Sequence, residues 1–203
     1  PAFARFHDPK AAHLCYNETI HYPQRRNTMA YKHAPTYKEL QEMRQLIPDK
    51  IPFTPLQIAS LILGSLCVLA TIGLLWYEWP EIDTIIPTHY GLDGQANAWG
   101  SKNSLLPLLA LDILLYLGIV ILLCFPKIWN VPYPFTAETV VWTYQQMRSM
   151  LCLLDLAIAL GFGYIIYASY HLDRLPLWFL ILFMLAVFVP LIYYWRRLKK
   201  RLT

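Results

Sequence analysis

The sequence contains little charge. Only 15% of its 203 residues are Asp, Glu, Lys or Arg, against about 25% in soluble domains. Hydrophobic residues make up 57%, and the mean hydropathy is +0.37. This composition excludes a water-soluble globular enzyme, a disordered chain and a nucleic-acid-binding domain, so nucleic acid is not an expected partner.

Signatures of metal binding and catalysis are also lacking. The four cysteines form no CxxC pair, so the chain has neither the spacing of a zinc site nor that of a redox pair. No HExxH, GxSxG or P-loop pattern is present. We therefore expect no enzymatic activity, no metal and no cofactor.

Long apolar runs dominate the chain. They cover residues 55–77, 105–125, 150–170 and 177–195. At about 1.5 Å per residue the first run is roughly 34 Å long, enough to cross a hydrocarbon core of about 30 Å. The runs predict an all-α integral membrane protein with four transmembrane helices, in a membrane domain over residues 54–195.

The segments outside this domain are more polar. Residues 1–28 lack periodicity and precede a plausible start at Met29, so we expect them to be a disordered extension that packs on nothing. Residues 29–53 predict a cytoplasmic amphipathic segment on the membrane surface. Its apolar positions at helical spacing are Tyr37, Leu40, Met43 and Ile47. Residues 196–203 form a basic cytoplasmic tail.

The distribution of positive charge predicts the orientation. With four spans, 15 of the 17 Lys and Arg residues lie on one side of the membrane, and only Lys102 and Arg174 lie on the other. Because Lys and Arg are retained on the cytoplasmic side, we expect both termini in the cytoplasm and the loop 78–104 outside.

This outer loop has the pattern of a small hairpin. Two extended stretches flank a turn containing Asp93 and Gly94. In the loop, His89 and Lys102 are placed to bracket an anionic ligand, and His89 alone is a candidate for titration near neutral pH. Alternatively, His89 only hydrogen-bonds the loop backbone while Trp99 sits at the lipid surface.

A motif within this loop resembles one found in bacterial SdpI-type immunity proteins, in the form Pro-x-His-aromatic-Gly-x-x-Gly followed by aromatic-Gly-x-Lys. The candidate binding residues on this motif are Pro87, His89, Tyr90, Gly91, Gly94, Asn97, Trp99 and Lys102. Asn97 stands where that family more often has Asp. The similarity extends over roughly residues 56–170, including Asn130, Pro132, Thr136, Glu138 and Arg148.

The resemblance implies a function and a location. It implies a non-enzymatic protein of the bacterial cytoplasmic membrane that resists a secreted toxic peptide, with the outer loop meeting the peptide and a cytosolic regulator bound on the inner side. A candidate regulator surface is one helical face within 136–151, formed by Val140, Tyr144, Met147 and Leu151. The alternative is that this face extends the third span and packs on its neighbours.

Two acidic residues interrupt the apolar runs. A charged Asp near a helix centre costs about 2.5–3.5 kcal/mol, so Asp112 and Asp155 are functional candidates. We expect them at different depths, not sharing a proton, with Asp112 bonded to a hydroxyl of Ser60, Ser65 or Tyr164. They are either structural polar contacts or part of a proton or ion path. A small transporter or channel component, or an accessory subunit of a larger membrane complex, is therefore the alternative function.

Small residues four apart predict close helix contacts. The pairs are Ser60 with Gly64, Ala157 with Gly161, and Ala159 with Gly163. These contacts lie either within the helix bundle or between the protomers of a homo-oligomer.

Overall fold

The computed structural model describes residues 37–48, 51–131, 133, 135–172 and 174–202. All of them belong to one compact unit of the chain, His33–Thr203. Residues 1–28, for which we predicted a disordered extension, lie outside the described residues.

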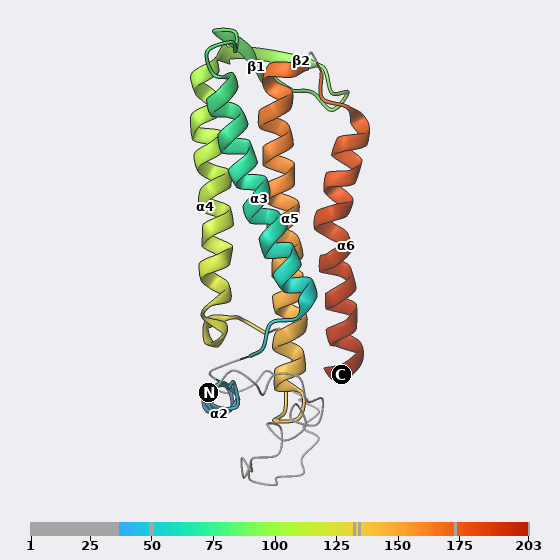
Figure 1. Ribbon diagram of the computed structural model, residues 1–203. Coiled ribbons are helices and arrows are strands. Elements are labelled where there is room, and N and C mark those ends of the chain that lie inside the picture. The colour runs from blue at the N-terminus through green and yellow to red at the C-terminus, as the bar shows by residue number, and fades with distance from the viewer. Residues whose placement is uncertain (1–36, 49–50, 132, 134, 173, 203) are drawn as a thin grey trace, which may run out of the picture. The chain divides into compact units, whose positions relative to one another are not determined.

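Four long helices confirm the predicted fold class (Figure 1). They are α3 (Pro55–Glu78), α4 (Leu105–Leu123), α5 (Val140–His171) and α6 (Leu177–Leu202). Each is long and apolar enough to cross a membrane. A short helix, α2 (Tyr37–Gln45), lies in the segment for which we predicted an amphipathic helix.

Helix α5 is the element on which the other long helices pack. It lies against α3, α4 and α6, whereas α3 and α4 touch each other only sparsely. Small residues allow this close approach, because Gly163 faces Thr71 of α3 and Gly161 faces Phe183 of α6. Gly64 of α3 in turn faces the ring of Tyr116 on α4. The small-residue pairs therefore mark helix contacts within one chain.

Helix α3 begins at a capping box. The Thr54 hydroxyl accepts a hydrogen bond from the Gln57 backbone N–H (3.4 Å), and Gln57 Oε1 accepts one from the Thr54 N–H (3.1 Å). Gln57 Nε2 then donates to the Gln145 carbonyl (3.0 Å) and to Ser149 Oγ (2.8 Å) on α5. One buried side chain thus caps α3 and ties it to α5.

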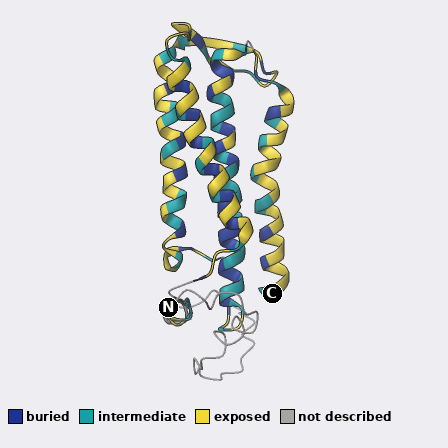
Figure 2. Ribbon diagram, in the orientation of Figure 1, coloured by how far each residue is buried: buried dark blue, intermediate teal, exposed yellow. Residues whose placement is uncertain are grey.

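The outer surface of the helices is apolar. Large side chains such as Leu69, Leu114 and Ile181 are exposed, and exposed residues follow the outward faces of all four long helices (Figure 2). Several polar residues, among them Ser60 and Thr143, are buried. A surface of exposed leucine is unfavourable in water and suits contact with lipid chains.

A two-stranded hairpin covers one end of the helices. Strand β1 (Ile85–Tyr90) pairs antiparallel with β2 (Ala96–Ser101), which confirms the predicted hairpin. Ile86 of β1 is buried in an apolar cluster with residues of α3, α4 and α5. We call this the hairpin end, and the opposite end, where α6 terminates in basic residues, the basic end (Figure 1).

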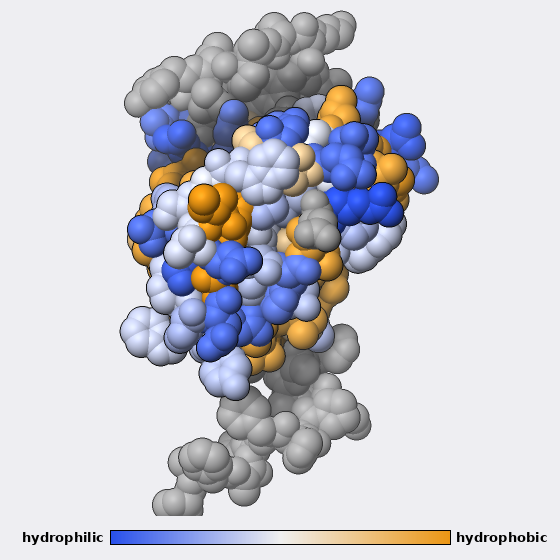
Figure 3. Space-filling view, turned by 90° about the horizontal axis from the view of Figure 1, so that it is seen from above, coloured by the Kyte–Doolittle hydropathy of each residue, from blue (hydrophilic) through white to orange (hydrophobic). Residues whose placement is uncertain are grey.

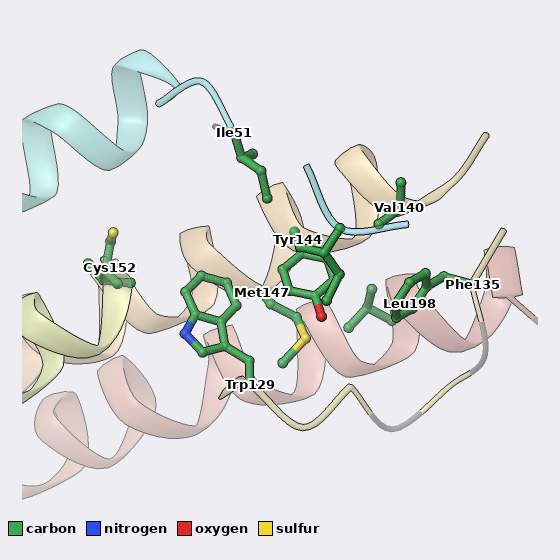
Figure 4. Packing of buried hydrophobic residues seen from close by; sticks show 10 residues of the cluster. Ile51, Trp129, Phe135, Val140, Tyr144, Met147, Cys152 and Leu198 are labelled. Carbon is green, nitrogen blue, oxygen red and sulfur yellow. The ribbon is translucent and has the colours of Figure 1, made fainter. Parts of the chain in front are cut away.

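An aromatic cluster fills the basic end (Figure 4). The ring of Tyr144 on α5 stacks on Trp129 at 5.6 Å between centroids and meets the edge of Phe135 at the same distance. Val140 and Met147 are buried in the same cluster. The face for which we considered a cytosolic regulator is therefore covered by the protein itself, as the packing alternative predicted, and binding of a cytosolic regulator stays a prediction.

Two helices extend beyond the predicted apolar runs. Helix α5 begins at Val140, whereas the predicted span begins at residue 150. Polar residues such as Gln145 and Arg148 interrupt the hydropathy there, but Arg148 is buried and donates a hydrogen bond to the Ile51 carbonyl (2.8 Å). Helix α6 continues to Leu202, so the basic tail is helical.

Candidate functional site

Lys102 holds the hairpin to the end of α3. Its ammonium donates hydrogen bonds to the carbonyls of Trp79 (2.8 Å) and Ile82 (3.0 Å) and lies 5.1 Å from the centre of the Trp79 indole ring. A cation here is favourable because the last carbonyls of a helix lack partners and carry partial negative charge. The Lys102 ammonium is thus engaged in capping α3, and a shared role with His89 in binding an anion stays a prediction.

Gly94 docks the tip of the hairpin on the α5–α6 connection. Its carbonyl accepts a hydrogen bond from the Leu175 N–H (2.8 Å), and its φ of +78° favours glycine. A Cβ at this position would lie 2.0 Å from the Leu175 carbonyl oxygen. Beside this contact, Gln95 forms an antiparallel bridge with Arg174.

Gly91 closes the turn at the same tip. Its N–H donates to the Gln95 carbonyl (2.8 Å), and its own carbonyl accepts from the Gly94 N–H (2.9 Å). Gly91 and Gly94 are therefore explained by the tight turn and by the close backbone approach of the loop before α6.

His89 and Asn97 face each other across the two strands. The Nδ1 atom of His89 lies 2.5 Å from Oδ1 of Asn97, and both side chains are exposed. With Nδ1 donating to this oxygen, Nε2 remains an acceptor that another molecule can approach. An amide at position 97 fills this role as a carboxylate would.

The proline and the two aromatic residues of the motif have different surroundings. The Tyr90 hydroxyl donates to the Ala168 carbonyl of α5 (3.4 Å), and its ring packs beside Leu175 and Phe179. Pro87 pairs with Trp99 across the strands. The Trp99 side chain is 60% exposed, so it remains available to a ligand or to lipid headgroups.

A cavity of about 320 Å³ lies beneath the hairpin. Its walls come from β1, the start of α4, the end of α5 and the loop before α6. The lining residues are Pro87, Thr88, His89, Tyr90, Ser104, Leu105, Leu108, Ile165, Ser169 and Leu175. The hydroxyls and the imidazole sit among apolar side chains, which suits an amphipathic ligand.

Sequence reasoning found only part of this cavity. Pro87, His89 and Tyr90 belong to the motif, whereas Ser104, Ile165, Ser169 and the other lining residues do not. These residues come from segments far apart along the chain, and no local spacing pattern marks them.

The two acidic candidates lie away from the cavity. Asp112 on α4 and Asp155 on α5 are 0% and 1% exposed, and none of their four carboxyl oxygens has a hydrogen-bond partner among the described residues. None of the three expected hydroxyls bonds to Asp112. Ser65 Oγ bonds to the Tyr116 hydroxyl (2.7 Å), Ser60 Oγ donates to the Leu56 carbonyl (2.9 Å), and the Tyr164 ring stacks on Phe179 of α6.

A further polar contact at the hairpin end joins α3 to α5. His171 Nε2 lies 2.9 Å from a carboxylate oxygen of Glu78. No local pattern marks this pair, because the two residues are 93 positions apart in the sequence. Within the described part of the chain, no group of three His, Cys, Asp or Glu side chains is arranged to hold a metal ion.

Residues 66–111 match the model of a domain of unknown function, DUF1648. No curated protein and no solved structure matches the chain. The matched segment begins in α3, contains the whole hairpin with Lys102, and ends in α4 at Leu111, just before Asp112. The segment that recurs in other proteins is therefore the hairpin with the two helix portions that flank it.

We predict that Gly94→Ala destabilises the protein. The positive φ alone costs an L-residue about 1–2 kcal/mol, and the new methyl group would also collide with the Leu175 carbonyl. The thermal unfolding temperature in detergent should fall, as measured by circular dichroism.

Gly73→Ala is the matched control for this substitution. A Cβ at Gly73 meets no atom within 4 Å, and alanine favours a helix interior by roughly 0.5–1 kcal/mol over glycine. The unfolding temperature should therefore stay equal or rise. Equal effects of the two substitutions would show that the hairpin tip is not docked on Leu175.

Proposed function

We propose that this chain is a binding protein of the bacterial cytoplasmic membrane, similar to SdpI-type immunity proteins, that meets a secreted peptide at its hairpin end. The proposal assigns it a recognition role without catalysis. The observation that carries it is the cavity beneath the hairpin, whose lining combines Thr88, His89 and Ser104 with apolar side chains.

Exposed apolar side chains on the hairpin support this role. Leu92 at the tip is 96% exposed and Ile85 at the start of β1 is 66% exposed. Figure 3, which looks onto this end, shows hydrophobic residues lying among hydrophilic ones. A membrane-active peptide has apolar and polar faces, so a mixed surface above an apolar cavity suits it.

The charge distribution supports an outward-facing hairpin. The basic end carries Arg196, Arg197, Lys199, Lys200 and Arg201 in the last turns of α6. Positive residues beside a span favour the cytoplasmic side, so the hairpin end would face the outside, with both termini in the cytoplasm. A secreted peptide reaches a membrane from that side.

A survival assay tests the proposal. The chain is expressed in a bacterium that is sensitive to purified membrane-active peptides, and minimum inhibitory concentrations are measured for a panel of them. We expect protection of about tenfold against at least one peptide, equivalent to a binding difference near 1.4 kcal/mol. Ser104→Trp should abolish this protection, because Ser104 lines the cavity and an indole would fill it.

Leu114→Trp is the control for the added indole. Leu114 is 68% exposed on α4 and does not line the cavity, so its substitution should leave protection intact. The proposal would be rejected if the chain protected against no peptide in the panel. It would also be rejected if Ser104→Trp protected as well as the unaltered chain when the two proteins are present in the membrane in equal amounts.

The intramembrane carboxyls favour a second candidate function. Buried polar groups usually have hydrogen-bond partners, and charged residues within membrane spans often mark ion or proton pathways. Asp112 and Asp155 have no such partners among the described residues. A small transporter or channel component that uses both carboxyls is therefore the alternative to peptide binding.

Asp112→Asn separates the two functions. The amide keeps the shape of the side chain and removes the titrating group, so we expect unchanged assembly and unchanged peptide protection. Proton flux is measured with a pH-sensitive dye in liposomes that contain the purified chain. Flux that is lost in Asp112→Asn, together with protection that does not depend on the hairpin, would favour the transporter.

A further inference from the structure

Helix α6 carries a groove that is apolar in one half and basic in the other. The groove has a volume of about 530 Å³ and lies at the basic end. Val189, Ile192 and Tyr193 line its apolar half, and Arg196, Arg197 and Lys200 line its basic half. The spacing of these residues places them along one face of the helix.

Most of this face points away from the rest of the protein, while Arg197 at its edge contacts Trp142 of α5. At the basic end of α6 the buried residues are Tyr194 and Leu198, and both lie on the other side of the helix. Val189 and Ile192 are more than half exposed. In a membrane, lipid therefore covers the groove.

The position of the groove along α6 matches the layers of a bilayer. Helix α6 starts at Leu177, and Arg196 lies about 28 Å further along its axis at 1.5 Å per residue. That distance is close to the thickness of the hydrocarbon core, about 30 Å. The apolar half of the groove thus lies beside acyl chains and the basic half lies at headgroup level.

Aromatic contacts fix one of the three cations. Arg197 Nη1 donates to the Tyr193 hydroxyl (3.0 Å), and its guanidinium lies 5.9 Å from the Trp142 ring centre. An arginine held in this way can bind phosphate oxygens without first being ordered. Helix α6 contains no Asp or Glu, so its own sequence supplies no counter-charge.

We propose that this groove is a binding site for an anionic phospholipid of the leaflet at the basic end. The phosphate lies between the guanidinium groups of Arg196 and Arg197 and the ammonium of Lys200. An acyl chain follows Val189 and Ile192. The site is independent of the peptide-binding role, because it lies at the opposite end of the helices.

Lipid retention tests the site. The full chain is purified in detergent, mixed with phosphatidylglycerol or phosphatidylcholine of identical acyl chains, and analysed by native mass spectrometry. Both lipids carry one phosphate, but the quaternary ammonium of phosphatidylcholine is repelled by the three lining cations. We therefore expect phosphatidylglycerol to be retained about tenfold more strongly. Inorganic phosphate should not displace it, because free phosphate lacks the acyl chain.

Two double variants with the same loss of charge give the decisive comparison. The R196Q/K200Q variant removes two lining cations, whereas K199Q/R201Q removes two that do not line the groove. We expect the first to lose the preference for phosphatidylglycerol and the second to keep it. Equal losses would mean attraction by overall charge alone and would overturn the proposal, as would equal retention of the two lipids.

A third variant tests the apolar half without altering charge. Ile192→Trp places an indole in the groove next to exposed positions, where it disturbs no buried contact. Retention of phosphatidylglycerol should fall while the unfolding temperature in detergent is unchanged. Full retention in this variant would show that the acyl chain does not follow the groove, and would also overturn the proposal.

Discussion

The contact between Lys102 and the end of α3 fixes the arrangement at the hairpin end. A helix that leaves a membrane exposes carbonyls that need donors, and the Lys102 ammonium supplies two hydrogen bonds to the chain just beyond α3. Because Lys102 directly follows β2, this cap also positions the hairpin. Gly94 and Tyr90 extend the same attachment to the loop before α6 and to α5. The cavity beneath β1 exists because the hairpin is held at these points.

The helices are organised by close packing and buried polar groups instead of by an apolar core alone. In lipid, exposed leucines gain nothing by clustering, so helix contacts depend on small residues and hydrogen bonds. Gly161 and Gly163 allow α5 to approach its neighbours, and Gln57 links α3 to α5 through two hydrogen bonds. Asp112 and Asp155 depart from this pattern, since their carboxyls are buried without hydrogen-bond partners among the described residues. That departure is why a transport role is the second candidate.

The fold was predictable from the sequence, and the site was predictable only in part. Apolar runs and the Asp93-Gly94 turn mark four helices and a hairpin, because both signals are local. The motif located Lys102 but did not show that it caps a helix. It also did not locate Ser169, which lines the cavity from a segment far away in the sequence. Periodicity at Val140 and the residues after it indicated an apolar face without distinguishing burial in the protein from binding of a partner. The aromatic cluster at the basic end supplies the cover for that face.

The accessibility of the hairpin tip from outside the cell tests the central claim most directly. A single cysteine is placed at Leu92, which is 96% exposed, with the native cysteines replaced. Intact cells are then treated with a membrane-impermeant maleimide, and a second protein with its cysteine at Lys200 reports on the basic end. The account predicts labelling at position 92 in intact cells and at position 200 only after lysis. The reverse pattern would place the hairpin in the cytoplasm and contradict a role in meeting a secreted peptide.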